Sequence, residues 1–426
     1  MACSLAERAE LPVSRNARDP RFPRPGSVGE NALSPAGASP LPRRPALDEL
    51  ARDKLEALER RQLRRRLVVT ARRGATEALQ ADAELVSFSC NDYLGLSQHP
   101  EVVAASIDAT RRFGVGAGSS RLVTGNHPLY VELERKLAEL KGTQDAVVFG
   151  SGYLTNLGVI SALAGRSDLI LMDELCHSSL LTGASSSGAR VLEFRHNDVE
   201  HAAELLAAER AAHRHCLVLT DGVFSMEGDL APLPPLAALA AEHDAWLMTD
   251  DAHGLGVVGD GRGSSFAFGE PVAIPLQMGT LSKAAGVYGG YLCASHNVAE
   301  LVRNRARSFV YSTGLPPGTV AAASRALELI ATDKELVRRP LARAREFTSA
   351  LELPAAQSAI VSLLMGGAAR ALTASASLRA AGFLVAAIRP PTVPPGTSRL
   401  RVTFSAAHTS EQVAALAAAV RPLLRA

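Results

Sequence analysis

The chain has 426 residues, 47% of them hydrophobic and 21% charged, and its 45 basic and 43 acidic side chains give a net charge of +2. Because the charge is balanced and no basic stripe alternates with aromatic residues, a nucleic-acid-binding role is excluded. No apolar run approaches the ~18 residues of a membrane-spanning helix, and the N-terminus lacks a signal-type apolar core. Single cysteines without a CxxC pair predict reduced thiols in a cytoplasmic protein without a metal site; they are Cys3, Cys90, Cys176, Cys216 and Cys293.

Four segments follow from changes of composition and periodicity along the chain. Residues 1–45 are rich in Pro, Arg, Ser and Gly without periodicity, which predicts a disordered extension. Residues 46–85 open with a helical pattern that runs to about Arg66. Residues 86–335 are expected to form a large domain, and residues 336–426 a small C-terminal α+β domain, because the rhythm of strands and helices changes there.

Seven short apolar runs alternate with helical stretches in the large domain. The runs are residues 146–149, 169–172, 191–194, 216–220, 245–249, 274–278 and 291–294. Strands that are apolar without alternation and are separated by helices predict an α/β fold with a mostly parallel seven-stranded sheet, covered on both faces. Ligands of such sheets bind outside the carboxyl ends of the strands.

Polar residues directly follow five of these runs. They are Gly152 and Tyr153 after the first run, His177 after the second, Ser225 after the fourth, Asp250 and His253 after the fifth, and Thr280 and Lys283 after the sixth. Alone, a histidine is more often a satisfied core residue, and a strand-end aspartate more often caps a helix. Their shared position at one edge of the sheet nevertheless predicts a functional site there.

Lys283 stands among small residues in the segment Thr280–Gly286, where nothing bulky keeps a flat ligand from its amine. Desolvation can remove the charge of such an amine and make it a nucleophile toward a carbonyl, although a snorkelling or paired lysine is the alternative. A phosphate cradle at Gly150–Asn156 and the pair Asp250 and His253 complete the set that pyridoxal 5′-phosphate (PLP) needs.

The glycine-rich loop Gly114–Arg121 invites a different interpretation, a dinucleotide site. Its glycine spacing differs from GxGxxG, no strand precedes it, and no P-loop sequence occurs in the chain. A nicotinamide-dependent enzyme is therefore not expected.

The chain resembles the α-oxoamine synthases, which are PLP enzymes of fold type I, from about Leu47 to the C-terminus. The matching segments are Asn91–Leu96, Gly118–Gly125, Gly150–Asn156, His196–Asp198, Gly222–Asp229, Asp250–Gly256 and Thr280–Gly286. Ile388–Pro394 followed by Arg399–Arg401 is most similar to the oxononanoate-forming branch of that family.

This resemblance implies roles for the residues of the cofactor site. Lys283 would form the Schiff base and carry the proton, Asp250 would pair with the pyridinium nitrogen, and His177 would stack on the ring. The residues implied around the phenolic oxygen, the ring edge and the phosphate are Ser225, His253, Gly152, Tyr153 and Thr280.

Further residues are implied on the substrate side. Asn91 and Arg389 would hold the substrate carboxylate, since an arginine before two prolines sits on stiff backbone. Arg64 and Thr392 resemble substrate-contacting positions, as does His177. Asp221 stands where several relatives have Glu, and it receives no role.

The implied reaction is a decarboxylative condensation of L-alanine with a pimeloyl thioester, on CoA or a carrier protein, in biotin synthesis. The segment Tyr311–Thr313 resembles one that reaches the phosphate of a neighbouring subunit, which implies a homodimer. Glycine C-acetyltransferase, which uses glycine and acetyl-CoA, is the alternative within the family. A non-catalytic protein of the same fold is the other alternative, but it is expected to lack the lysine found at position 283.

Overall fold

The computed structural model describes residues 46–80 and 83–425, so the predicted extension at residues 1–45 lies outside the described residues. By its internal contacts the chain divides into two units, Met1–Glu56 and Ala57–Ala426. Within the described ranges, no helix is both long and apolar enough to cross a membrane.

Helix α1 (Leu47–Arg60) contains the described part of the first unit, and none of its residues is buried. The sequence predicts this helix as far as about Arg66, whereas it ends at Arg60. It ends there because Gln62 adopts a φ of 56° and the Leu63 N–H turns back to the Leu58 carbonyl at 2.8 Å.

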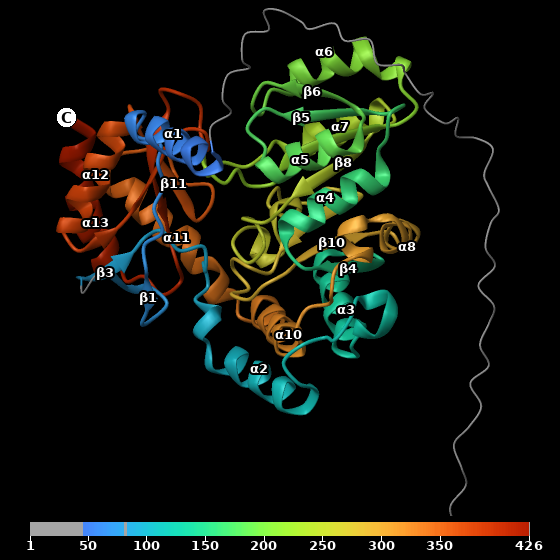
Figure 1. Ribbon diagram of the computed structural model, residues 1–426, viewed down its shortest axis with the longest axis horizontal. Helices are drawn as coiled ribbons and strands as arrows, with labels where there is room; N and C mark the ends of the chain where they lie inside the picture. Colours follow the sequence, from blue (N-terminus) through green and yellow to red (C-terminus); the bar gives the residue numbers. More distant parts are fainter. Residues whose placement is uncertain (1–45, 81–82, 426) are drawn as a thin grey trace, which may run out of the picture. The chain divides into compact units, whose positions relative to one another are not determined.

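A seven-stranded sheet forms the centre of the second unit (Figure 1), in the order β4-β10-β9-β8-β7-β5-β6. Its strands are β4 (Asp145–Phe149), β5 (Leu169–Asp173), β6 (Arg190–Phe194), β7 (Cys216–Asp221), β8 (Trp246–Asp250), β9 (Leu276–Thr280) and β10 (Gly290–Ala294). Six strands run in the same direction, and only β10 runs antiparallel to them. The predicted mostly parallel sheet of seven strands is confirmed.

Both faces of this sheet are buried under helices, which explains why its strands are apolar without alternation. The helices of this part are α2 (Pro100–Phe113), α3 (Leu129–Lys141), α4 (Gly152–Leu163), α5 (Ser178–Ser187), α6 (Val199–Glu209), α7 (Leu233–Glu242), α8 (His296–Arg305), α9 (Arg307–Val310) and α10 (Pro317–Thr332). Helices α4, α5 and α8 pack on one face of the sheet. Helices α6 and α7, with α3 and α10, share cores with the other face.

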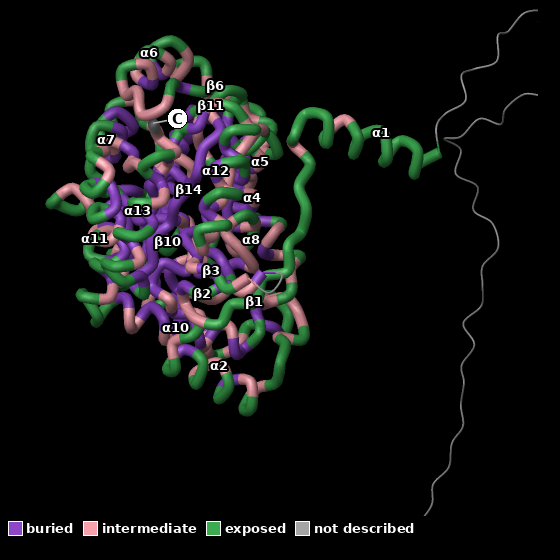
Figure 2. Tube along the Cα trace, turned by 90° about the vertical axis from the view of Figure 1, so that its left-hand side faces the viewer, coloured by how far each residue is buried: buried purple, intermediate pink, exposed green. Residues whose placement is uncertain are grey.

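The C-terminal part is a small antiparallel sheet with three helices, as the predicted α+β domain requires. The sheet has the order β11-β14-β13. Its elements are α11 (Lys334–Ala350), β11 (Ile360–Gly366), α12 (Ala368–Ala380), β13 (Ala386–Ile388), β14 (Ser398–Thr403) and α13 (Ser410–Arg425). Strand β14 is buried along its whole length (Figure 2).

A second small sheet, which the sequence does not predict in full, joins strands before the large domain to one strand of the C-terminal part. Its strands are β1 (Ala71–Arg72), β2 (Glu77–Gln80), β3 (Ala83–Ser87) and β12 (Phe383–Leu384). β3 pairs in parallel with β12. The chain that enters the large domain is thereby held against the C-terminal part.

Candidate active site

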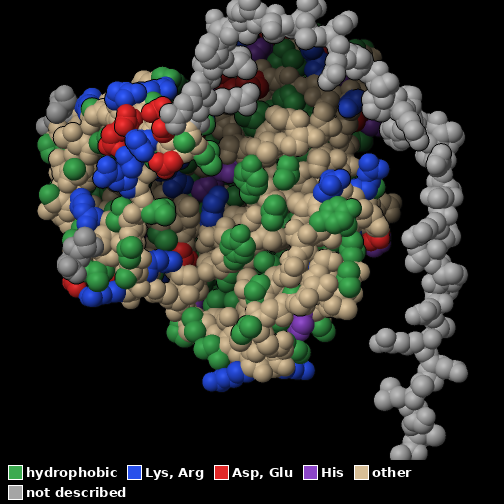
Figure 3. Space-filling view, viewed as in Figure 1, with side chains coloured by type: hydrophobic (Ala, Val, Ile, Leu, Met, Phe, Trp, Pro, Cys, Tyr) green, Lys and Arg blue, Asp and Glu red, His purple; other side chains and the backbone are tan. Residues whose placement is uncertain are grey.

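A pocket of about 250 Å³ opens at the carboxyl ends of strands β4, β5, β7, β8 and β9. Histidine and basic side chains gather in a hollow of the molecule (Figure 3). The pocket brings together every residue that the sequence assigns to the cofactor, namely Gly152, Tyr153, His177, Ser225, Asp250, His253, Thr280 and Lys283.

Lys283 reaches the pocket from a tight turn after β9. The Gly286 N–H donates to the Lys283 carbonyl at 2.8 Å, and Gly286 has a φ of 71°. A Cβ on this glycine would lie 2.3 Å from the backbone nitrogen of Ser97, so the turn requires glycine. The small residues around the lysine therefore allow the turn to pack closely against the preceding chain.

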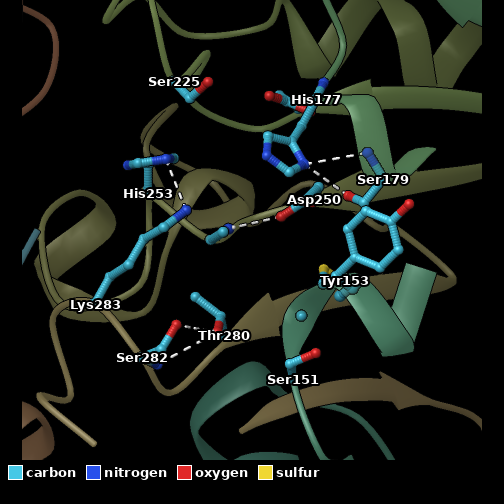
Figure 4. Close-up of a pocket in the computed structure, with 14 residues that line it drawn as sticks. Ser151, Tyr153, His177, Ser179, Ser225, Asp250, His253, Thr280, Ser282 and Lys283 are labelled. Carbon is cyan, nitrogen blue, oxygen red and sulfur yellow. Dashed lines mark hydrogen bonds between the residues drawn. The ribbon is translucent and has the colours of Figure 1, made fainter. Parts of the chain in front are cut away.

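The amine of Lys283 lies in contact with His253 inside the pocket (Figure 4). The distance from Lys283 Nζ to His253 Nε2 is 2.7 Å. Burial lowers the pKa of Lys283 to about 8, although the negative charge of Asp250 acts in the opposite direction. The amine is therefore a far better nucleophile and base near neutral pH than an exposed lysine.

Asp250 ends strand β8 and is held by two donors. Its Oδ2 accepts from Asn156 Nδ2 at 2.7 Å, and its Oδ1 accepts from the Ala252 N–H at 3.0 Å. Asp221 occupies the paired position on β7. Burial and the negative charge of Asp250 raise the pKa of the Asp221 carboxyl well above its usual range.

His177 precedes helix α5, and its ring points into the pocket near Asp250 (Figure 4). Its Nδ1 lies 2.7 Å from Ser179 Oγ, and its backbone N–H donates to Asp221 Oδ1 at 3.1 Å. Burial lowers the pKa of His177, which keeps the imidazole neutral. A flat neutral ring held at one side of the pocket suits stacking against an aromatic ligand.

His253 is buried between Lys283 and the phenol of Tyr93. Its Nδ1 lies 2.6 Å from Tyr93 Oη, while its Nε2 contacts the lysine amine. Burial and the positive charge of Lys283 hold the pKa of His253 well below its usual range. A neutral imidazole with both nitrogens engaged fixes where the amine of Lys283 rests.

Arg401 on β14 joins this network from the C-terminal part. Its Nη1 donates to Asn91 Oδ1 at 3.2 Å, its Nη2 to Tyr93 Oη at 3.4 Å, and its Nε to the Ser225 carbonyl at 2.5 Å. Its charge also contributes to lowering the pKa of Lys283. The sequence assigns no role to Tyr93 or Arg401, although both stand in segments that carry the family resemblance.

The N-terminus of α4 forms the other end of the pocket. Ser151 caps this helix by accepting from the Leu154 N–H at 3.3 Å. A Cβ on Gly152 would lie 3.1 Å from Met278 Cε, so glycine lets the first turn approach β9. Thr280 Oγ1 lies 2.8 Å from Ser282 Oγ. The amides of a helix start beside two hydroxyls suit a phosphate group.

The residues predicted on the substrate side lie outside the pocket lining, apart from His177. Asn91 Oδ1 accepts from Arg401 Nη1 at 3.2 Å and from Tyr93 Oη at 3.3 Å. Arg389 Nη1 donates to the Gln62 carbonyl. The two remaining residues are also engaged: Arg64 Nη1 lies 3.3 Å from Glu59 Oε2, and Thr392 Oγ1 accepts from Arg65 Nη2 at 2.7 Å. Residues 62–65 and 389–392, far apart in sequence, therefore lie side by side.

This donor set fits PLP. A lysine amine with a lowered pKa suits the aldehyde, a buried carboxylate suits the ring nitrogen, and a helix N-terminus suits the phosphate. The hydroxyl of Ser225 and the imidazole of His253 border the same pocket and suit the phenolic oxygen.

The lowered pKa of Lys283 gives a prediction for the reaction of the cofactor-free protein with PLP. The rate of covalent attachment follows the fraction of free amine, so it should rise with pH through a midpoint of about 8. An unperturbed lysine would give a midpoint of ~10.4. Stopped-flow absorbance between pH 6 and 10 measures this rate, and a midpoint near the unperturbed value would contradict the predicted burial effect.

Comparisons with known proteins agree with this geometry. The family model for class I and II aminotransferases matches residues 83–420. The 8-amino-7-oxononanoate synthase of Methylocella silvestris is 59% identical over 82% of this chain and 99% of its own. That of Granulibacter bethesdensis is 57% identical over 89% of this chain and 98% of its own.

Solved structures share the fold. The chain matches the Sphingomonas wittichii serine palmitoyltransferase with a TM-score of 0.82 and 32% identity, over 89% of this chain and 97% of that one. The serine palmitoyltransferase from S. paucimobilis, solved with a bound PLP–myriocin aldimine, matches with a TM-score of 0.83 and 30% identity, over 90% and 99% of the two chains. The chain belongs to the class I and II aminotransferase family, and within it to the 8-amino-7-oxononanoate synthases.

Proposed function

We propose that this protein uses PLP to condense L-alanine with a pimeloyl thioester, giving 8-amino-7-oxononanoate, carbon dioxide and a free thiol. The observation that carries the proposal is the pocket in which the amine of Lys283, the carboxylate of Asp250 and the neutral ring of His177 meet. The name shared by close relatives supports the same activity.

In this proposal each pocket residue has a separate role toward the cofactor or the substrate. When bound, PLP supplies an aldehyde for an amine and a protonated ring that accepts electron density from the amino acid. Lys283 would hold the cofactor, and its Nζ would take the proton from the substrate Cα. Asp250 would hold a proton on the ring nitrogen, and His177 would stack against the ring. His253 keeps the free amine within reach.

For the substrate carboxylate we propose Arg401 as a partner beside Asn91. Its guanidinium contacts Asn91 and Tyr93, and Tyr93 contacts the histidine that holds Lys283. Arg389, the arginine predicted from the sequence, instead donates to the Gln62 carbonyl.

Matched variants distinguish the two arginines. Arg401→Lys should raise the KM for L-alanine at least tenfold, because a bidentate charged contact is worth ~1.5–3 kcal/mol. Arg389→Lys should leave that KM within about twofold. Steady-state kinetics at saturating acyl donor measures both constants, and the reverse pattern would assign the carboxylate to Arg389.

For the distal end of the acyl chain we propose the cluster at residues 62–65 and 389–392, which includes Arg64 and Thr392. Its basic and hydroxyl groups suit a terminal carboxylate. Pimeloyl-CoA and pimeloyl carrier protein carry the same thioester, so this proposal includes both as acyl donors.

We also propose that the enzyme is a cytoplasmic homodimer. Val115, Val123 and Tyr311 are 82%, 73% and 76% exposed, and their two segments are joined by a bridge between Ser120 and Thr313. Such apolar exposure suits a surface covered by a second copy. The free cysteines of the described chain suit a reducing compartment. Sedimentation equilibrium tests the dimer, and a monomer at micromolar concentration would contradict it.

Thiol release from purified enzyme with PLP tests the proposed reaction. L-alanine with pimeloyl-CoA, or with pimeloyl carrier protein, should turn over well, whereas glycine with acetyl-CoA should not. If only the glycine and acetyl-CoA pair reacts, the enzyme is a glycine C-acetyltransferase instead. If no pair reacts while PLP binds, the enzyme uses another amino acid or acyl chain.

A further inference from the structure

Asn156 lies behind the pocket, on the second turn of α4, and it is fully buried. Its Nδ2 donates to Asp250 Oδ2 at 2.7 Å and to Ser179 Oγ at 2.9 Å. It does not line the pocket, yet it contacts two residues that do. One amide group thus joins the carboxylate at the end of β8 to the start of α5.

The directions of these hydrogen bonds are fixed by chemistry. An amide nitrogen has two hydrogens, and here both are used. Reversing the amide would place Asn156 Oδ1 against the carboxylate of Asp250, which repels it. Ser179 Oγ therefore accepts from Asn156 and is left with one hydrogen to donate.

That hydrogen points to His177. His177 Nδ1 already accepts from the Ser179 backbone N–H at 3.3 Å, so it acts as an acceptor. The Ser179 hydroxyl, 2.7 Å away, then donates to the same nitrogen. The neutral imidazole must carry its proton on Nε2, and one chain of contacts sets its tautomer and its tilt.

Close packing of the two helices holds this arrangement in place. A Cβ on Gly183 of α5 would lie 2.9 Å from the Asn156 carbonyl and 2.8 Å from Ile160 Cδ1. Because Gly183 lets the backbones approach, the side chains of Asn156 and Ser179 have little freedom to move. Among the described residues, Asn156 Oδ1 has no hydrogen-bond partner, so the two hydrogen bonds that Nδ2 donates are what satisfy this buried amide.

We propose that Asn156 is a positioning residue that orients Asp250 and, through Ser179, His177, so that both meet the cofactor ring as one unit. This inference rests on the proposed use of PLP. Without the Asn156 amide, the carboxylate of Asp250 would no longer be held in one orientation. Of the two donors described above, only the Ala252 N–H would remain. Ser179 Oγ would lose the donor that directs its own hydrogen toward His177 Nδ1, so the His177 ring would be held less firmly.

Three variants separate the contact of Asn156 with Asp250 from its contact, through Ser179, with His177. Asn156→Leu removes the hydrogen bonds to Asp250 and to Ser179 at similar side-chain volume. Ser179→Ala removes only the contact that leads to His177. Asn304→Leu is the matched control, since Asn304 Nδ2 donates to Glu300 on the exposed surface of α8, away from the pocket. Circular dichroism and thermal melting of the cofactor-free proteins report whether each variant folds.

The readouts are the dissociation constant of PLP and the pH at which its visible absorbance changes. Asn156→Leu should weaken PLP binding about tenfold or more, because charged hydrogen bonds are lost. It should also move the absorbance change to higher pH, since a less firmly protonated ring leaves the imine nitrogen more basic. Ser179→Ala should weaken binding less and leave that pH within about 0.3 units. Asn304→Leu should match the unmodified protein.

The outcomes separate this inference from the proposed function. If the unmodified protein binds no PLP, both fail. If it binds PLP and a folded Asn156→Leu variant has the same dissociation constant and pH profile, only the role of Asn156 is overturned. If Asn156→Leu does not fold, Asn156→Ser, which keeps one donor, decides: an intermediate affinity supports the proposal and an unchanged one overturns it.

Discussion

A Lys283→Ala variant is expected to lose the visible absorbance of covalently held PLP and at least 10³-fold of its activity. The variant lacks both the amine that bonds the aldehyde and the base at the substrate Cα, and a general base alone contributes typically 10²–10⁴-fold. No other lysine lines the pocket within the described chain. Absorbance spectra and thiol-release assays on the purified variant measure both effects.

Lys334→Ala is the matched control for this experiment. Lys334 is exposed, and its Nζ donates to the Asp260 carbonyl at 3.1 Å. Its loss should leave absorbance and turnover unchanged. Normal absorbance in the Lys283→Ala variant would rule out Lys283 as the anchor.

Replacing Lys141 with methionine is expected to cost about 3–5 kcal/mol of unfolding free energy, the usual loss when one partner of a buried ion pair is removed. Lys141 and Asp251 have side-chain exposures of 0% and 1%, with Nζ 2.7 Å from Asp251 Oδ2. Nζ also donates to the Arg262 carbonyl at 2.6 Å, and Asp251 Oδ1 accepts from the Ser264 N–H at 2.9 Å. The variant leaves a buried carboxylate without its counter-charge.

The backbone packs closely around the carboxylate of Asp251. A Cβ on Gly263 would lie 1.7 Å from Asp251 Oδ2, and one on Gly254 would lie 1.9 Å from Oδ1. Both glycines let the backbone close tightly around the carboxylate. Because Asp251 follows Asp250 directly, the same pair also stabilises the loop that carries the pocket residues.

Lys136→Met, on the same helix, provides the control for Lys141→Met. Lys136 pairs with Glu328 and Glu132 while remaining partly exposed, so its loss should cost only about 0–1 kcal/mol. Combining Lys141→Met with Asp251→Asn should recover part of the lost stability, because the unpaired charge is removed. Urea unfolding measures all three, and equal losses for Lys141→Met and Lys136→Met would contradict a special role for the buried pair.

The sheet and the cofactor side of the site were predictable because both depend on local sequence. Apolar runs mark the strands, and the residue that follows each run must lie at the strand end. Lys283 was recognisable from its small neighbours. The structure gives a reason for one of them, since Gly286 has a positive φ and lies too close to Ser97 to carry a side chain.

The contact between Arg401 and Asn91, on which the proposed substrate site depends, was not predictable because it joins distant segments. Arg401 meets Asn91 only because β14 runs beside residues 88–93, with the Thr403 N–H donating to the Phe88 carbonyl at 2.8 Å. No periodicity fixes that register. Arg389 attracted attention through its two prolines, but stiff backbone does not determine where a guanidinium points.

Asn156 and Asp221 escaped prediction for a different reason. An asparagine inside a helix and an aspartate at a strand end both have ordinary structural explanations. Their roles depend on what they contact. Asn156 donates to Asp250 and Ser179, whereas Asp221 pairs in register with Asp250 and accepts from the backbone N–H of His177. Only the packing of α4, α5, β7 and β8 reveals these contacts.

Borohydride reduction of the enzyme with PLP, followed by mass spectrometry of its peptides, tests the central claim most directly. The chain has five lysines, Lys54, Lys136, Lys141, Lys283 and Lys334, so the modified position is unambiguous. Modification of the peptide that contains Lys283, at one cofactor per chain, is the predicted result. Modification of any other lysine in its place, or no modification at all, would contradict the site and the chemistry proposed for it.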